Sequence, residues 1–182
     1  MKRLLIAALA LAYLSVGLSA QALMPNAYAG LFVDQIHSGT AVYYVTPLTP
    51  FTMWIWWLPS EKGIMAVEFQ IIYPSNVIGI TVTVNPLVAA ELGDLASGES
   101  AAFGDCQMAC VWTHQQACYL TDMSPSFIQI VAHPTGGGLN VATCEEGHPI
   151  EAATALTPLY LNQSGPIAAE PVSWGAIKGL YR

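Results

Sequence analysis

Four cysteines and two histidines recur at a step of four residues in the second half of the chain. They are Cys106, Cys110, His114 and Cys118, followed by Cys144 and His148. On a helix this step would stack the side chains on one face, and on a strand an even step also keeps them on one side. Thiolates and imidazoles are ligands that suit zinc. One interpretation of these residues is therefore a zinc site.

The cysteines also fit a second chemistry, because an even number of cysteines in an exported chain is the usual sign of a disulfide framework. The stretch Val111-Trp112-Thr113 is typical of a strand, and the C-x-x-C knuckle of many zinc sites is absent. We therefore favour disulfides and keep the zinc site as the alternative. Three connectivities are possible. We favour Cys106–Cys118 with Cys110–Cys144, which closes one local loop and ties down one distant strand.

Three tryptophans, Trp54, Trp56 and Trp57, lie close together in an apolar run. Exposed indoles stack on sugar rings, so these residues are candidates for a carbohydrate-binding platform. The run is apolar on both sides of them, however, and buried aromatic side chains dominate the cores of sandwiches. A position in the core is therefore the favoured interpretation, and the platform is the alternative.

Motifs of catalysis are absent: the sequence has no nucleophile elbow, phosphate loop, H-E-x-x-H or dinucleotide fingerprint. Asp34 and His37 lie close together, and we expect a structural role for them. Asp94, Asp105 and Asp122 are candidates for calcium ligands, although no loop has the spacing of an EF-hand. We predict no enzymatic activity, no catalytic residue and no cofactor, with structural calcium or zinc kept as alternatives.

The elements that must position these residues are short strands separated by turns. The strand-like runs are Ala41–Val45, Phe51–Leu58, Met65–Ile71, Val77–Val84, Leu87–Leu92, Val111–Thr121, Phe127–Ala132, Leu139–Thr143 and Leu156–Leu161. One helical turn is the alternative for Leu87–Leu92, and two strands with a break near Gln115-Gln116 are the alternative for Val111–Thr121. Phe51–Leu58 is continuously apolar, which predicts burial on both faces, whereas Met65–Ile71 alternates as a strand with one face toward water does. About eight or nine strands, without an amphipathic helix of normal length, predict an all-β fold. We expect a single antiparallel β-sandwich or jelly roll over residues 30–162.

One stretch carries a family resemblance. Phe69-Gln70-Ile71-Ile72-Tyr73-Pro74-Ser75-Asn76-Val77 resembles a recurring element of cohesin-like β-sandwiches, in which an alternating strand ends in a tyrosine and a turn. The resemblance covers residues 51–162 and implies a nine-stranded jelly roll that binds another protein. The cysteine-rich middle of the chain departs from the family's pattern, and no partner-binding residue carries over.

The N-terminus has the order of a secretory signal peptide. Met1-Lys2-Arg3 is basic, no charge occurs from Leu4 to Leu18, and Ser19-Ala20-Gln21-Ala22 supplies small residues. The best cleavage site follows Ala22, which gives a signal peptide over residues 1–22, and a site after Ala29 is the alternative. The apolar run is short for a membrane span, which needs about 20 residues. We predict an exported protein that is secreted, periplasmic or at the cell surface, with no transmembrane segment in the mature chain.

Cleavage would make an acidic chain more acidic. The whole sequence has 5 basic and 12 acidic residues, and the loss of Lys2 and Arg3 leaves three basic residues and a net charge of −9. Lys62 is the only cation between Gly30 and Ile177. Phosphate backbones and anionic membrane surfaces both attract basic patches. The composition therefore argues against nucleic acid, and against an anionic membrane surface, as the partner.

The end of the chain differs in composition from the rest of the sequence. Residues 163–172 are typical of a linker, and they precede a tail over residues 173–182. The tail contains Trp174, Ile177, Lys178, Tyr181 and Arg182. It resembles the short Trp-Gly-x-Ile-Lys-x-Leu-Tyr-Arg endings of some exported bacterial proteins, which suggests a recognition tag for sorting or surface attachment. A frayed or docked terminus is the alternative.

Taken together, these features favour an exported, non-enzymatic β-sandwich that binds a protein or a cell-envelope component. A carbohydrate-binding module is the second hypothesis. An enzyme or a metal-binding protein that uses the cysteine and histidine cluster is the third.

Overall fold

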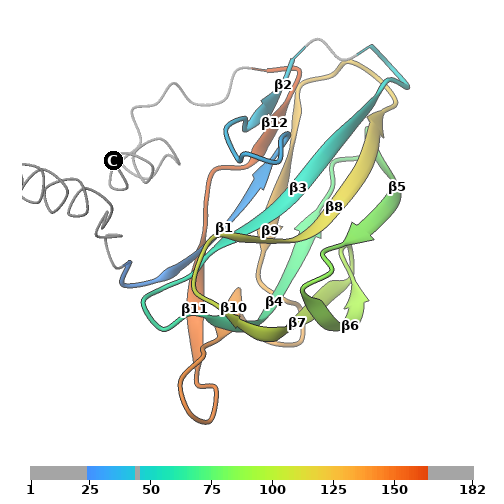
Figure 1. The fold of residues 1–182 in the computed structure, drawn as a ribbon. Coiled ribbons are helices and arrows are strands. Elements are labelled where there is room, and N and C mark those ends of the chain that lie inside the picture. The colour runs from blue at the N-terminus through green and yellow to red at the C-terminus, as the bar shows by residue number, and fades with distance from the viewer. Residues whose placement is uncertain (1–23, 44–45, 164–182) are drawn as a thin grey trace, which may run out of the picture.

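The computed structural model describes residues 24–43 and 46–163 (Figure 1). The predicted signal peptide and the tail, with Trp174, Ile177, Lys178, Tyr181 and Arg182, lie outside the described residues. Within them the chain forms strands and no helix, and therefore no helix long and apolar enough to cross a membrane. The predicted all-β class is confirmed.

The described part of the chain contains twelve strands. They are β1 (Ala27–Phe32), β2 (Ala41–Val42), β3 (Pro50–Leu58), β4 (Ile64–Ile72), β5 (Val77–Val84), β6 (Val88–Asp94), β7 (Gly98–Gln107), β8 (Val111–Leu120), β9 (Ser126–Val131), β10 (Asn140–Ala142), β11 (Ile150–Ala155) and β12 (Leu159–Leu161). Most neighbouring strands are antiparallel. The exceptions are β1 with β11 and β12 with β2, which pair in parallel.

The strands form the two layers of a sandwich (Figure 1). One layer has the order β5–β8–β3–β1–β11. In the other, β6 pairs with β7 and β7 with β4, and β4 continues through β9 to β12 and β2. Strand β10 pairs with both β4 and β11 and so closes one side of the sandwich. On the opposite side β5 and β6 are the end strands of their layers, and this side is open.

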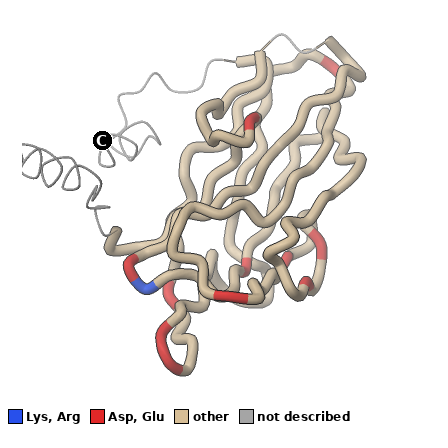
Figure 2. The backbone as a smooth tube through the Cα atoms, viewed as in Figure 1, with Lys and Arg blue, Asp and Glu red and all other residues tan. Residues whose placement is uncertain are grey.

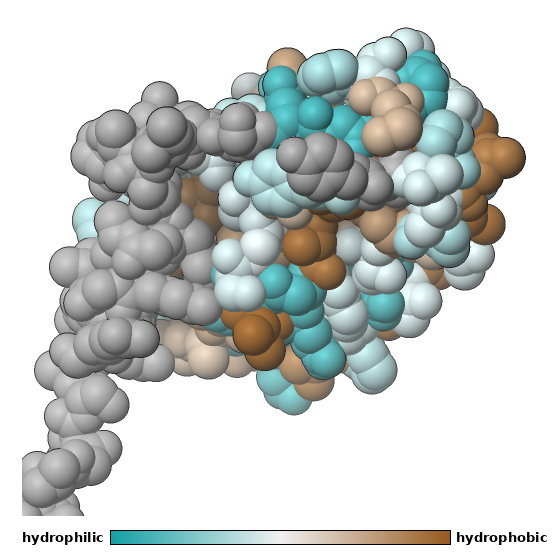
Figure 3. Space-filling view, turned by 90° about the horizontal axis from the view of Figure 1, so that it is seen from above, coloured by the Kyte–Doolittle hydropathy of each residue, from teal (hydrophilic) through white to brown (hydrophobic). Residues whose placement is uncertain are grey.

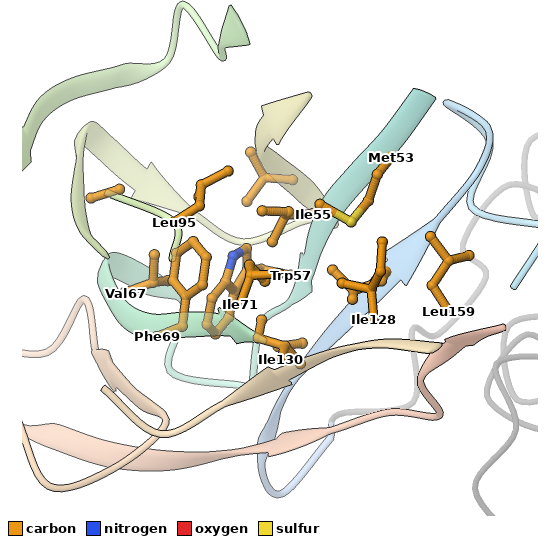
Figure 4. Packing of buried hydrophobic residues seen from close by; sticks show 14 of the residues in the cluster. Met53, Ile55, Trp57, Val67, Phe69, Ile71, Leu95, Ile128, Ile130 and Leu159 are labelled. Atoms are coloured by element: carbon orange, nitrogen blue, oxygen red, sulfur yellow. The ribbon is translucent and has the colours of Figure 1, made fainter. Parts of the chain in front are cut away.

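Apolar side chains from facing strands fill the space between the layers (Figure 4). The labelled core residues are Met53, Ile55 and Trp57 of β3, Val67, Phe69 and Ile71 of β4, Ile128 and Ile130 of β9, with Leu95 and Leu159. The predicted alternation of β4 is confirmed for Val67, Phe69 and Ile71, which all face the core. The prediction that β3 is buried on both faces is wrong, because its second face carries the half-exposed Trp54 and Trp56.

The predicted disulfide pairing needs correction. Cys106, near the end of β7, is bonded to Cys144 in the loop after β10, with Cα atoms 5.6 Å apart. Cys118 lies near the far end of β8, and a strand that rises about 3.3 Å per residue places it about 23 Å from Val111, near which β7 ends. The predicted Cys106–Cys118 and Cys110–Cys144 bonds are therefore wrong. The thiol of Cys118 is instead fully buried in the core.

Candidate functional site

Strands β3, β8 and β5 present one side of the sandwich that no other described strand covers, which we call the outer face. Their register pairs outward residues with outward residues, for example Thr52 with Ala117 and Gln115 with Thr83. The outer face consists of Thr52, Trp54 and Trp56 of β3, Trp112, Gln115, Ala117 and Tyr119 of β8, and Ile78, Thr81 and Thr83 of β5. Those of β3 and β8 are half-buried and those of β5 are exposed.

The outer face is uncharged, because none of its three strands contains an aspartate, glutamate, lysine or arginine. Figure 2 shows the acidic residues mainly at the end of the molecule that carries the β3–β4 and β10–β11 turns. The edge strand β5 also exposes apolar side chains: Ile78, Ile80 and Val82 are 42%, 56% and 43% exposed. Figure 3 shows apolar surface along the side on which Figure 1 draws β5.

The structure separates the three tryptophans, for which the sequence favoured the core and kept a carbohydrate platform as the alternative. Trp57 is fully buried, its ring lies 5.5 Å from that of Phe69, and its Nε1 donates a hydrogen bond of 3.3 Å to Thr113 Oγ1. Trp54 lies on the outer face, where it packs edge-to-face on Trp112 with ring centroids 5.0 Å apart. Trp56 is half-buried beside the ring of His37.

The six cysteines and histidines proposed as zinc ligands do not come together. Cys106 and Cys144 form the disulfide, and Cys118 lies in the core at the far end of β8. Cys110 packs on a small apolar cluster of Met24, Phe32 and Leu58. His148 Nδ1 donates to the carbonyl of Thr143 at 3.0 Å, and His114 has different neighbours altogether.

His114 belongs to a group of three residues at the open side of the sandwich, which we call the inner cluster: Glu91 of β6, Glu99 of β7 and His114 of β8. Each offers one ligand atom, and these atoms lie within 4.8 Å of one another. His114 Nε2 is 2.9 Å from Glu91 Oε1. Glu99 is 3% exposed and His114 is 1% exposed, whereas the Glu91 side chain reaches the surface.

The two layers position the inner cluster from opposite sides. Phe69 of β4 pairs with Glu99, so both side chains face the interior, and the His114 ring lies 5.9 Å from the Phe69 ring. Glu91 pairs with Ala101, two residues along β7 from Glu99, which makes the two carboxylates diagonal neighbours on one face. Three strands from two layers therefore bring two carboxylates and an imidazole to one place.

Burial controls the charges of the inner cluster. Burial, with the nearby carboxylate of Glu91, raises the pKa of Glu99 to about 7, although the backbone amides of Leu92 and Ser100 donate hydrogen bonds to it. Burial also lowers the pKa of His114, against the opposite effect of Glu91. Near pH 7 the inner cluster therefore holds fewer charges than two carboxylates and an imidazolium would.

A separate cleft of about 400 Å³ lies on the same open side of the sandwich. Its walls include Gly79 and Val82 of β5 and Leu95 of the β6–β7 turn. Gln116, the next inward residue of β8 after His114, also lines the cleft, and its Oε1 accepts a hydrogen bond of 2.6 Å from the Tyr73 hydroxyl. Burial raises the pKa of Tyr73, so this hydroxyl stays protonated.

Two of the three aspartates proposed as calcium ligands organise turns, and the third, Asp105, lies in strand β7. Asp94 accepts hydrogen bonds from the backbone of Ala96 and from Ser97, and Asp122 accepts from the Ser124 amide at 2.7 Å. The Asp34 carboxylate likewise accepts from Ser38 and Gly39. These contacts fit the structural role expected for Asp34.

The chain has a β-sandwich fold like that of cohesins. The structure matches a cohesin from Clostridium thermocellum, solved as a type I cohesin–dockerin complex, with a TM-score of 0.51 over 75% of this chain and 93% of that one. It also matches the sixth cohesin of Acetivibrio cellulolyticus scaffoldin B, solved with a Cel5 dockerin, with a TM-score of 0.52 over 76% and 99%. Both are 10% identical in sequence. No protein-family model matches the sequence, and no curated protein is similar to it.

Proposed function

We propose that this chain is an exported β-sandwich that binds a protein partner through its outer face and catalyses no reaction. The observation that carries the proposal is the composition of this face, which is uncharged and contains the aromatic rings of Trp54, Trp112 and Tyr119. At the centres of protein interfaces, tryptophan and tyrosine are enriched and charged residues are depleted. When a partner covers such a surface, no charged side chain on it has to be stripped of water.

The size of the outer face predicts how the partner binds. Three strands spaced about 4.8 Å apart, each about 27 Å long, cover roughly 400 Å² of flat sheet. A standard protein interface buries about 800 Å² on each partner. We therefore expect the partner to contact the loops that border the outer face as well, including the turn that follows β8.

The comparisons support a protein as the partner. Both cohesins that share the fold were solved as complexes with dockerins. The likeness to them is one of fold, so it supports this class of function without naming a partner for this chain. A destination outside the cytoplasm, and a cell-envelope component as the partner, belong to the same proposal and rest on the predicted signal peptide.

A pair of matched variants tests the outer face. Thr81 of β5 and Thr154 of β11 are both exposed strand residues, but Thr81 lies on the outer face whereas Thr154 lies on a strand beyond it. Thr81→Glu would place a charge in the interface, and Thr154→Glu makes the same change elsewhere. We expect a partner captured from the native cell envelope, and then purified, to bind the Thr154→Glu protein normally and the Thr81→Glu protein at least about tenfold more weakly. Equal binding of both variants would refute the proposed face.

A carbohydrate ligand is the second candidate, and Trp54, Trp56 and Trp112 favour it because all three are half-exposed on one side of β3 and β8. The planes of Trp54 and Trp112 are 85° apart, so a flat sugar ring can stack on only one of them. Protease treatment of the envelope distinguishes the two candidates. Loss of binding supports a protein partner, whereas binding that survives and that is abolished by Trp54→Ala supports a carbohydrate.

A further inference from the structure

We propose that Glu91, Glu99 and His114 form a binding site for one divalent transition-metal ion, with zinc as the best fit. The three residues come from three strands and from both layers, and their ligand atoms already lie within 4.8 Å of one another. This site is separate from the outer face, because His114 points to the interior side of β8.

The three ligand atoms already lie close to the spacing that a bound zinc ion requires. Zinc binds imidazole nitrogen and carboxylate oxygen at about 2.0–2.2 Å, so neighbouring ligands of a tetrahedral ion lie about 3.3–3.5 Å apart. His114 Nε2 and Glu91 Oε1 are now 2.9 Å apart and would separate slightly, while the longest ligand separation of up to 4.8 Å would close by about 1.3 Å. The Glu91 side chain is 40% exposed, so it has room to move when the ion binds.

A second observation shows that the protein alone does not satisfy the inner cluster. Glu99 Oε1 is buried and has no hydrogen-bond partner among the described residues. A buried acceptor without a partner costs about 1–3 kcal/mol. A cation placed between Glu99 and His114 would give the carboxylate the partner that it lacks.

The donor set selects the kind of ion. Two carboxylates balance the charge of a divalent cation, and one imidazole favours zinc and other transition metals over calcium, which takes six to eight oxygen ligands. Three protein ligands leave a fourth position for water. The exposed side chain of Glu91 marks the side from which the ion and that water enter. The ion would also tie β6 and β7 to β8 at the open side of the sandwich.

Zinc titration of the untagged mature chain, stripped with chelator, tests the site. We expect calorimetry to show one zinc ion per chain and zinc to raise the melting temperature. Glu91→Gln should weaken zinc binding by about tenfold or more. Even the loss of a residue that only hydrogen-bonds to a metal ligand typically lowers metal affinity by about 10–100-fold. Glu146→Gln removes the same charge from an exposed loop residue and serves as the matched control. It should bind zinc as the unaltered chain does.

Two further measurements keep the proposal open to refutation. Glu99→Gln alters a buried group, so its fold is first checked by its melting temperature without metal. Cobalt in place of zinc should give the intense visible absorption of a four-coordinate site in the unaltered chain and lose it in Glu91→Gln. The proposal fails if zinc does not bind below about 1 mM, if Glu91→Gln binds zinc as well as Glu146→Gln, or if calcium stabilises the protein and zinc does not.

Discussion

Strand β1 distinguishes the two predicted signal-peptide cleavage sites. Cleavage after Ala22 leaves β1 whole, whereas cleavage after Ala29 removes Ala27, Tyr28 and Ala29 from it. These three residues make the entire parallel pairing of β1 with β11, and two of them contribute to its pairing with β3. We therefore predict that the mature chain begins after Ala22, and that a chain beginning at Gly30 is severely destabilised.

The expected loss can be estimated from what the segment buries. Met24 is 8% exposed and packs with Phe32 and Leu58, and deletion of a buried methionine side chain costs about 2–5 kcal/mol. Ala27 and Ala29 are fully buried, and each methyl group contributes about 0.8 kcal/mol. The lost ladder hydrogen bonds contribute about 1 kcal/mol each. The total is of the order of the whole stability of a domain, which is about 5–15 kcal/mol.

Two measurements test this estimate. N-terminal sequencing of the exported protein gives the cleavage site directly. Urea denaturation then compares chains that begin at Leu23, Met24 and Gly30, where the chain from Met24 is the control that shortens the N-terminus and keeps β1 whole. We expect the first two to unfold at the same urea concentration and the third to lack a cooperative transition. A chain from Gly30 that is as stable as the others would refute the role given to β1.

Three other predictions concern the disulfide, the buried thiol and the tryptophans. Replacement of both Cys106 and Cys144 by alanine should lower the free energy of unfolding by about 4 kcal/mol, because the bond spans a sequence separation of 38 residues; an unchanged urea midpoint would contradict this. Burial raises the pKa of Cys118 to about 12, so iodoacetamide at pH 8 should label it, as followed by peptide mass spectrometry, only after unfolding. Labelling in the native protein would show that β8 opens. Trp57→Phe should cost about 1–3 kcal/mol in urea denaturation, since it leaves a cavity and removes the donor to Thr113, while Trp54→Phe on the outer face should cost less than about 0.5 kcal/mol. Similar costs would mean that the two rings are equally buried.

The strands with a clear hydrophobic pattern could be predicted from the sequence. Val77–Val84 and the single long strand after Val111 match β5 and β8 closely, because β-branched and aromatic residues there are bounded by turn residues. The resemblance of the stretch that begins at Phe69 to cohesin-like sandwiches is confirmed by the fold. β4 and β8 bury one apolar face in the common core, so pattern and packing agree there, whereas β5 is exposed over most of its length and its apolar residues identified the strand without showing its burial.

The strands made of small residues could not be predicted. β7 has Gly98 and Gly104 on either side of Glu-Ser-Ala-Ala-Phe, and glycines in such positions are typical of turns. Gly98 does adopt a positive φ of 123°, but the chain continues from it as a strand paired on both sides. β1 is rich in alanine because it lies between β3 and β11, and in the sequence its alanines were interpreted as an alternative cleavage site. In both strands, pairing by the backbone outweighs weak side-chain preference.

The inner cluster could not be predicted, because a single extra residue in β8 decides which way the side chains that follow it face. The ladder between β3 and β8 shifts register between Ile55 and Trp56, so Thr113 and His114, neighbours in sequence, are both buried. With strict alternation from the buried Val111, His114, Gln116 and Cys118 would face outward. The bulge turns them inward, where His114 meets Glu91 and Glu99 across the sandwich. It also sends the side chains between them to the outer face, so one bulge in β8 produces both the proposed binding face and the proposed metal site.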